Sequence, residues 1–441
     1  MKKIIIIALL CIVLLVASGM AQPTTVTQSV TQNADGFTAA TVQTAQNTAT
    51  ATSPGGAAVV TQTQTITQNA GTGAAGTATV TQNGQNTQPG TANGAAGSTI
   101  TAAVIQNAVT TAGGAINQRA RNNDASFVGG NPNRVITQAV TQMATAGPGT
   151  NINQGGIGGG LNPAYNSARV LGAGAVVQQS ITQTADGGNN VAQRANNRGP
   201  PGPNQATTWA LFIYSINGAR ASGTLGQSIT QNAGQTTPAS GGITQIGESN
   251  ARPIGSGSNT VQNIIQAGLT IGTGFGAGVT QTGQNLATPD TGANTNNNQN
   301  VQQAVTQTGA AIGGVAANVV NQRAYNAADA IGANININQL ITATATGTAV
   351  NQGTLPVPSV GSNMRNVVYV FARGGAPSAT VNQNQVLTAF GSGVIPGALV
   401  QASSNSAGVF WAPGATGTLA QAIAHNANPG FGGITQNGLN Q

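Results

Sequence analysis

One three-residue string recurs along the whole chain: a β-branched residue, then Thr or Asn, then Gln. Copies include Val26-Thr27-Gln28, Ile116-Asn117-Gln118 and Ile434-Thr435-Gln436. In the doubled copy ITQAVTQ, residues 136–142, a period of two places Ile, Val and both glutamines on one face, and Thr and Ala on the other. β-Branched residues also favour strands. The string therefore predicts many short strands, each with a face on which Val or Ile alternates with Gln.

Clusters of Gly, Asn and Asp separate these strings, as in Asn33-Ala34-Asp35-Gly36 and Ala185-Asp186-Gly187-Gly188. Gly and Asn supply the positive φ angles that tight turns need. We therefore expect an all-β chain, either a repetitive β-solenoid or stacked cross-β structure, with Gln/Asn ladders. A spacing of 36 residues suggests the length of one coil, and it occurs in two series: Gln46, Gln82, Gln118 and Gln154, and Gln106, Gln142 and Gln178.

Stacking gives a reason for glutamine at this spacing. Successive strands in a stack lie ~4.8 Å apart, so a Gln in one coil can hydrogen-bond the Gln above and below it. Two other interpretations use the same residues: a monomeric β-solenoid with internal ladders, and a disordered Gln/Asn-rich tract. We predict that the following residues form ladders that support assembly, within one chain or between chains: Gln28, Gln32, Gln68, Gln82, Gln118, Gln138, Gln142, Gln154, Gln303 and Gln307.

The chain divides into three parts by composition. Residues 1–21 are expected to be a signal peptide, 22–200 a Gln/Thr-rich β repeat region, and 201–441 a second β repeat region. The last part contains two strands, 209–216 and 367–371, that are apolar on both faces. Strands of that kind are usually buried between layers. Burial is therefore expected for their aromatic residues, which are Trp209, Phe212, Tyr214, Tyr369 and Phe371.

The amino-terminal segment has the features of a secretory signal peptide. Lys2 and Lys3 precede an apolar run over 4–16, and small residues lead to a cleavage site after Ala21. Cleavage would remove Cys11, the only cysteine, so the mature chain could form neither disulfides nor cysteine metal sites. An uncleaved anchor is the alternative. We expect an exported chain that meets a membrane only through this segment.

Little in the sequence predicts chemistry. Charged residues make up 4% of the chain, against roughly a quarter in ordinary soluble proteins. His425 is the only histidine and Glu248 the only glutamate, so a catalytic pair of glutamates is excluded. Calcium binding at turn aspartates such as Asp35 is a minor option. The net charge of +7 falls to +5 without Lys2 and Lys3, too weak and scattered for nucleic acid. We expect no enzyme and no cofactor.

The ladder repeats, the signal peptide and the Gly-Asn turns resemble curli-type functional amyloid subunits, although the Ser-Gln-Asn-Gln register of curli is not followed strictly. The whole chain is more similar to the major sheath protein of filamentous methanogenic archaea. That similarity covers a secreted chain of this size, low in charge, rich in Gln, Asn, Thr, Gly and Ala, with a mature region that lacks cysteine. It implies a tubular amyloid-like sheath around cells.

Two functions are consistent with these observations. The first is a secreted structural protein that assembles with itself, and with other cell-envelope components as further partners, into an extracellular fibre or cell sheath. The second is a monomeric β-solenoid adhesin whose loops bind a surface or carbohydrate.

Overall fold

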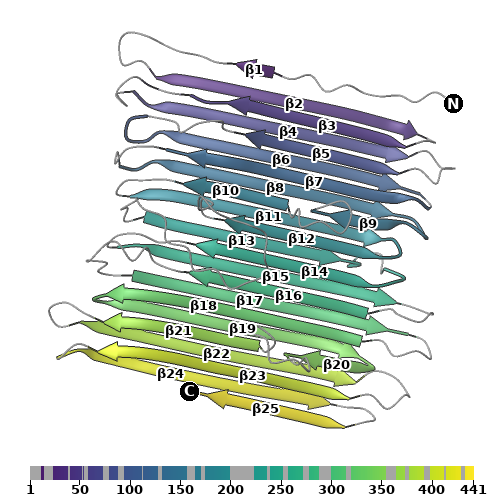
Figure 1. The fold of residues 1–441 in the computed structure, drawn as a ribbon. Helices are drawn as coiled ribbons and strands as arrows, with labels where there is room; N and C mark the ends of the chain where they lie inside the picture. Colours follow the sequence, from purple (N-terminus) through teal and green to yellow (C-terminus); the bar gives the residue numbers. More distant parts are fainter. Residues whose placement is uncertain are drawn as a thin grey trace, which may run out of the picture.

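The computed structural model contains only β-strands, stacked as a β-solenoid, in the residues that it describes (Figure 1). These residues are 11–13, 23–37, 40–51, 53, 58–72, 79–87, 94–111, 113–127, 132–155, 164–169, 174–198, 223–235, 239–251, 257–271, 278–287, 299–313, 319–353, 364–372, 377–391, 398–411, 414–428 and 433–441. The expected all-β solenoid is confirmed.

The chain alternates between two parallel sheets, so one coil contributes a strand to each. Sheet 1 has eleven described strands, which stack in the order β2(Thr24–Phe37), β4(Val60–Thr72), β6(Thr99–Thr110), β8(Val135–Ala146), β11(Ala175–Gly187), β13(Gly223–Ala233), β15(Asn259–Ile271), β17(Gln299–Ile312), β19(Ile335–Gly347), β22(Ser378–Gly391) and β24(Thr416–Asn428).

Sheet 2 has fourteen described strands. They are β1(Cys11–Val13), β3(Thr41–Ala49), β5(Val80–Thr87), β7(Ala115–Ser126), β9(Asn151–Gln154), β10(Ala164–Arg169), β12(Val191–Arg198), β14(Ile243–Ala251), β16(Gly278–Ala287), β18(Val319–Gly332), β20(Ala349–Gln352), β21(Met364–Ala372), β23(Leu399–Trp411) and β25(Ile434–Asn440). Two coils contribute two short strands each: β9 and β10 both pair with β7 and β12, and β20 and β21 both pair with β18 and β23.

Pairing is parallel and in register along the stack. Strands β17 and β19, for example, align from Gln299 opposite Ile335 to Ala310 opposite Thr346. The expected boundary between the two β repeat regions, at residue 200, falls outside the described residues. The strands on either side pair directly, β11 with β13 and β12 with β14, so both sheets continue past it. The first coil, β2 and β3, and the last coil, β24 and β25, lie at opposite ends of the stack (Figure 1).

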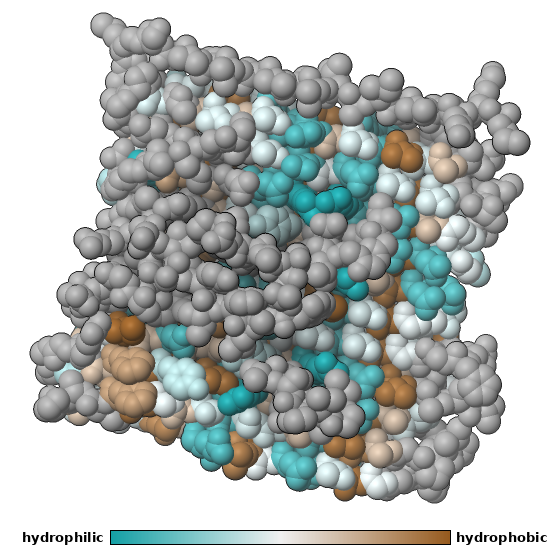
Figure 2. Space-filling view, viewed as in Figure 1, coloured by the Kyte–Doolittle hydropathy of each residue, from teal (hydrophilic) through white to brown (hydrophobic). Residues whose placement is uncertain are grey.

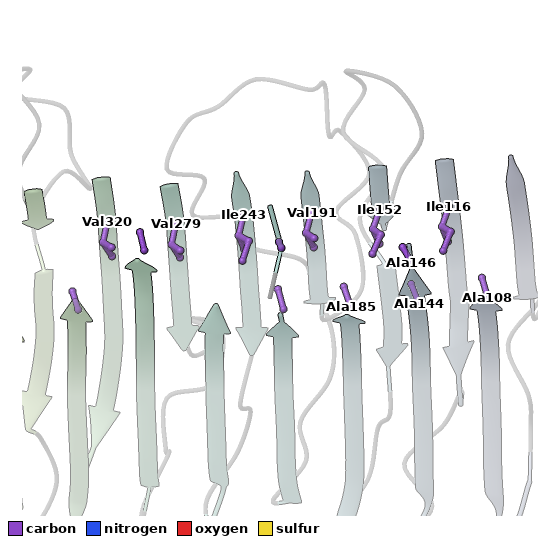
Figure 3. Packing of buried hydrophobic residues seen from close by; sticks show 14 of the residues in the cluster. Ala108, Ile116, Ala144, Ala146, Ile152, Ala185, Val191, Ile243, Val279 and Val320 are labelled. Carbon is purple, nitrogen blue, oxygen red and sulfur yellow. The ribbon is translucent and has the colours of Figure 1, made fainter. Parts of the chain in front are cut away.

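The sheets pack with large residues of one against small residues of the other. Val320, Val279 and Ile243 of sheet 2 belong to a buried cluster with the alanines that end the sheet 1 strands (Figure 3). Elsewhere the arrangement is reversed. A Cβ at Gly283 of sheet 2 would lie 2.6 Å from Cγ1 of Val305 of sheet 1. The two sheets can approach closely where a β-branched side chain of one meets an Ala or Gly of the other.

Apolar side chains also occur on the outer faces, and they correct one expectation. In β21, Val368 and Val370 are buried, but Tyr369 and Phe371 are 47% and 46% exposed. The prediction of burial is wrong for these two aromatics, because the strand keeps its period of two and turns them outward. Phe371 stacks on Phe410 of the next coil, with ring centroids 4.7 Å apart. Figure 2 shows apolar groups among mostly polar side chains on this view of the surface. Trp209, Phe212 and Tyr214 lie outside the described residues.

The spacing of 36 residues is confirmed in part. Gln118 follows Gln82, and Gln142 follows Gln106, at 36 residues in hydrogen-bonded contact. Gln46 and Gln178 do not belong to these series, because Gln43 pairs with Gln82 and Gln183 pairs with Gln142. Coils differ in length because their loops differ in size. The strands nevertheless stay in register from coil to coil.

We predict that Gly283→Ala destabilises the fold by about 1–3 kcal/mol, because the new methyl group overlaps Val305 in a packed core. Gly226→Ala is the matched control: its Cβ would meet only atoms 3.9 Å away or farther. Guanidinium unfolding of the two variants measures the difference. Equal stability would contradict the close packing of Gly283 on Val305.

Candidate self-association interface

Buried amides run through the interior of the solenoid alongside its apolar core. We call a set of residues at one register position in successive coils a column. Sheet 1 carries two glutamine columns. Column 1 is Gln28, Gln64, Ala102, Gln138, Gln179, Gln227, Gln262, Gln303, Gln339, Gln383 and Gln421. Column 2 is Gln32, Gln68, Gln106, Gln142, Gln183, Gln231, Gln266, Gln307, Ala343, Leu387 and His425.

Sheet 2 carries a third glutamine column and an asparagine column. Column 3 has Gln in every described coil: Gln43, Gln82, Gln118, Gln154, Gln193, Gln245, Gln281, Gln322, Gln352, Gln401 and Gln436. The asparagine column is Asn47, Asn86, Asn122, Asn166, Asn197, Ser249, Asn285, Asn326, Asn366, Asn405 and Asn440.

The ten glutamines predicted from the sequence all belong to these columns. Gln28, Gln138 and Gln303 are in column 1, Gln32, Gln68, Gln142 and Gln307 in column 2, and Gln82, Gln118 and Gln154 in column 3. The expected asparagine ladder is confirmed, but none of the residues of this column was named from the sequence. Its signal is an Asn four residues after the column 3 Gln, as in Gln82 and Asn86 or Gln401 and Asn405.

Each amide links its neighbours along the stack and also links the two sheets. Gln106 Nε2 donates to Oε1 of Gln68 at 2.7 Å and to the backbone carbonyl of Arg119 in sheet 2 at 2.9 Å. Gln183 repeats this with Gln142 at 2.8 Å and the carbonyl of Arg194 at 3.0 Å. The two N–H groups of one amide are thus both used, which a buried amide requires.

The donors point in a fixed direction along each column. In the glutamine columns the later coil donates to the earlier one, as Gln118 Nε2 does to Gln82 Oε1 at 2.9 Å. In the asparagine column the earlier coil donates to the later one, as Asn86 Nδ2 does to Asn122 Oδ1 at 2.8 Å. Each end of the stack therefore presents both donors and acceptors.

Within the described part of the chain, three buried acceptors without a partner lie at places where columns stop. Gln307 Oε1 has none, and the next residue of its column is Ala343. Asn285 Oδ1 has none, and Ser249 interrupts its column in the coil before. Asn47 Oδ1 also has none, and it belongs to the first coil. Among the described residues, the Oδ1 of Asn47 thus lacks a hydrogen-bond donor, as the amide oxygens beside a column break do.

The two end coils carry matching residues. Gln28, Gln32, Gln43 and Asn47 belong to the first coil, and Gln421, His425, Gln436 and Asn440 occupy the same columns in the last. β1 pairs with the first coil of sheet 2, with Cys11 opposite Asn47 and Val13 opposite Ala49. This short strand lies within the expected signal peptide.

Ionisable side chains lie mostly outside the columns. Asp329 is on an outer face, and partial burial raises the pKa of its carboxyl. His425 of column 2 is the exception. Arg134, just before β8, belongs to no column, but its side chain is buried, with the guanidinium 5.2 Å from the ring centroid of Phe127. The described residues contain no cluster of three or more His, Cys, Asp or Glu side chains that could hold a metal ion. Within the same residues, no helix could span a membrane.

We predict that Gln303→Ala lowers stability by about 2–5 kcal/mol, because it removes the buried partner of one N–H of Gln339 and the bonds that Gln303 donates to Oε1 of Gln262 and the carbonyl of Ala327. Gln302→Ala is the control, since Gln302 is the preceding residue and faces solvent. Denaturant unfolding of both variants gives the comparison. A similar cost for the two substitutions would show that the column contributes little to the fold.

Comparison with known protein families found no family model that matches this chain. No curated protein and no solved structure matches it either.

Proposed function

We propose that this chain is an exported structural protein that assembles end to end into an amyloid-like extracellular fibre or tubular cell sheath. The observation that carries the proposal is that three of the four columns, column 1, column 3 and the asparagine column, present an amide at both ends of the solenoid. A second copy placed on the end of the first would continue both sheets and every column. The alternative, a monomeric adhesin, uses the same internal ladders but gives the end coils no role.

Hydrogen-bond direction favours head-to-tail stacking. In the glutamine columns, the first coil of one copy would donate to the last coil of the copy before it, as Gln43 to Gln436 and Gln28 to Gln421. In the asparagine column, Asn440 would donate to Asn47, whose buried Oδ1 has no partner among the residues that the structure describes. In a head-to-head contact, two copies of the same end would meet, so donors would face donors and acceptors would face acceptors in every column.

The end strands also lack the usual protection against pairing. Natural edge strands are commonly guarded by charged residues or proline. β24 and β25 contain neither, and β3 contains neither. In β2 the one charged residue is Asp35, whose side chain is exposed on the outer face. Open edges of this kind are suited to growth by addition of strands.

Export and removal of the amino-terminal segment fit this scheme. With residues 1–21 present, β1 occupies the backbone of Asn47 to Ala49, where an added coil would pair. Cleavage after Ala21 would free that edge outside the membrane. A sheath or fibre is also the function that the resemblance to archaeal sheath proteins and curli-type subunits implies.

An end-blocking substitution tests the proposal. In Gln436→Lys, the ammonium can still donate to Gln401 Oε1, which Gln436 Nε2 contacts at 2.7 Å, so the chain should fold. The acceptor for the next copy is lost and a charge would be buried at the junction. We expect residues 22–441 to form polymers and the Gln436→Lys variant to remain monomeric, as measured by sedimentation and electron microscopy.

Thr435→Lys is the matched control, because it adds the same charge one residue earlier, on the outer face of β25. It should assemble like the parent chain. The adhesin alternative predicts that the parent stays monomeric at high concentration. Assembly of Gln436→Lys at the parental rate would contradict stacking through the end coils.

A further inference from the structure

We propose that His425 makes the junction between stacked copies sensitive to pH. The inference rests on the end-to-end assembly proposed above and specifies how it is regulated. His425 is the last member of column 2, opposite Leu387 of β22. In a head-to-tail stack, the next residue of that column is Gln32 of the following copy. The only histidine of the chain is thus placed at the one contact between copies where a column does not present an amide.

This contact needs an acceptor on the side of His425. Gln32 Nε2 donates one N–H to the carbonyl of Thr44 at 2.9 Å. Gln68 shows where the second N–H goes in a complete column, because its Nε2 donates to Gln32 Oε1 at 2.8 Å as well as to a carbonyl of sheet 2. A neutral imidazole offers one acceptor nitrogen, whereas an imidazolium has two donors and no acceptor. Protonation would therefore set a donor and a positive charge against the N–H of Gln32.

Among the described residues, no charged side chain lies against His425. His425 Nε2 lies 2.7 Å from Ser403 Oγ, so a neutral ring that donates from Nε2 keeps Nδ1 as an acceptor. The strands packed against it, β22, β23 and β25, contain no other titratable side chain. In the first coil, Asp35 is exposed on the outer face. Gln421 Nε2 donates to the carbonyl oxygen of Gln441, so a carboxylate at Gln441 would lie near Gln421. Gln421 is four residues before His425 in β24.

Stacking changes the burial of the ring. His425 is partly exposed in the single chain, and burial already lowers its pKa from 6.5. Column 2 residues with a coil on both sides, such as Gln68, Gln106 and Gln142, are fully buried. A second copy would bury the ring in the same way and lower its pKa further, because desolvation disfavours the charged form. Assembly therefore favours the neutral ring, is strongest above the pKa of the free chain, and weakens as the pH falls through it.

The experiment compares residues 22–441, carried on a tag without histidine, with the His425→Gln variant, which continues column 2 with an amide. Critical concentration for assembly is measured by sedimentation from pH 7.5 to pH 4.5. For the parent chain we expect it to rise on acidification, by up to about tenfold for each pH unit below the pKa of the free chain. For His425→Gln we expect no such rise. NMR titration of the single imidazole should give a lower pKa in the polymer than in the monomer.

The outcomes separate this inference from the proposed function. Parallel pH profiles for the parent and His425→Gln would overturn the role of His425 while leaving end-to-end assembly intact. The same holds for an imidazole pKa that is equal in monomer and polymer. If neither chain assembles at any pH, the proposed function fails and this inference fails with it. Ser403→Ala is an added control, because it removes the hydrogen bond to the ring but keeps the titration and should keep the pH dependence.

Discussion

A buried amide must find hydrogen-bond partners for both its N–H groups and its oxygen, and this requirement organises the molecule. In the glutamine columns one N–H goes to the neighbouring coil and the other to the facing sheet, as for Gln106. The requirement also specifies register. A slip of one residue would turn Gln outward and Thr inward, and a slip of two would set Gln against Val or Ile. The alternation of large and small residues between sheets, as at Val305 and Gly283, then allows the close approach that the amide contacts need.

The same requirement has consequences at the ends of the stack. Solenoid proteins usually end in capping repeats with a polar outer face. Here the last coil repeats the column residues of the coils before it, with Gln421, Gln436 and Asn440, and the first coil leaves the buried oxygen of Asn47 unpaired. Column breaks elsewhere, such as Ala343 after Gln307, show that the fold tolerates single losses. The end coils differ because all their columns stop together, which is why we assign them to contacts between copies.

Much of the fold and of the glutamine columns could be predicted from the sequence, because strand period and β-propensity act locally. The string of Val or Ile, Thr and Gln placed Gln138 and Gln142 correctly on one inward face. Asparagine ladders were expected, but the residues of this column were not named, because the string that located strand residues ends at Gln, four residues before Asn86 and Asn122. Tyr369 and Phe371 were expected to be buried because the apolar run was given more weight than its alternation. The position of His425 in column 2 could not be predicted, because loop lengths between coils hide the register.

The most direct measurement is a cryo-EM map, at side-chain resolution, of the polymer formed by residues 22–441. The account predicts that β24 and β25 of one copy stack on β2 and β3 of the next, with both sheets continuing at ~4.8 Å spacing across the junction. Gln436 should then lie beside Gln43, and Asn440 beside Asn47. A polymer joined through the outer faces of the sheets, with the end coils open to solvent, would contradict the account.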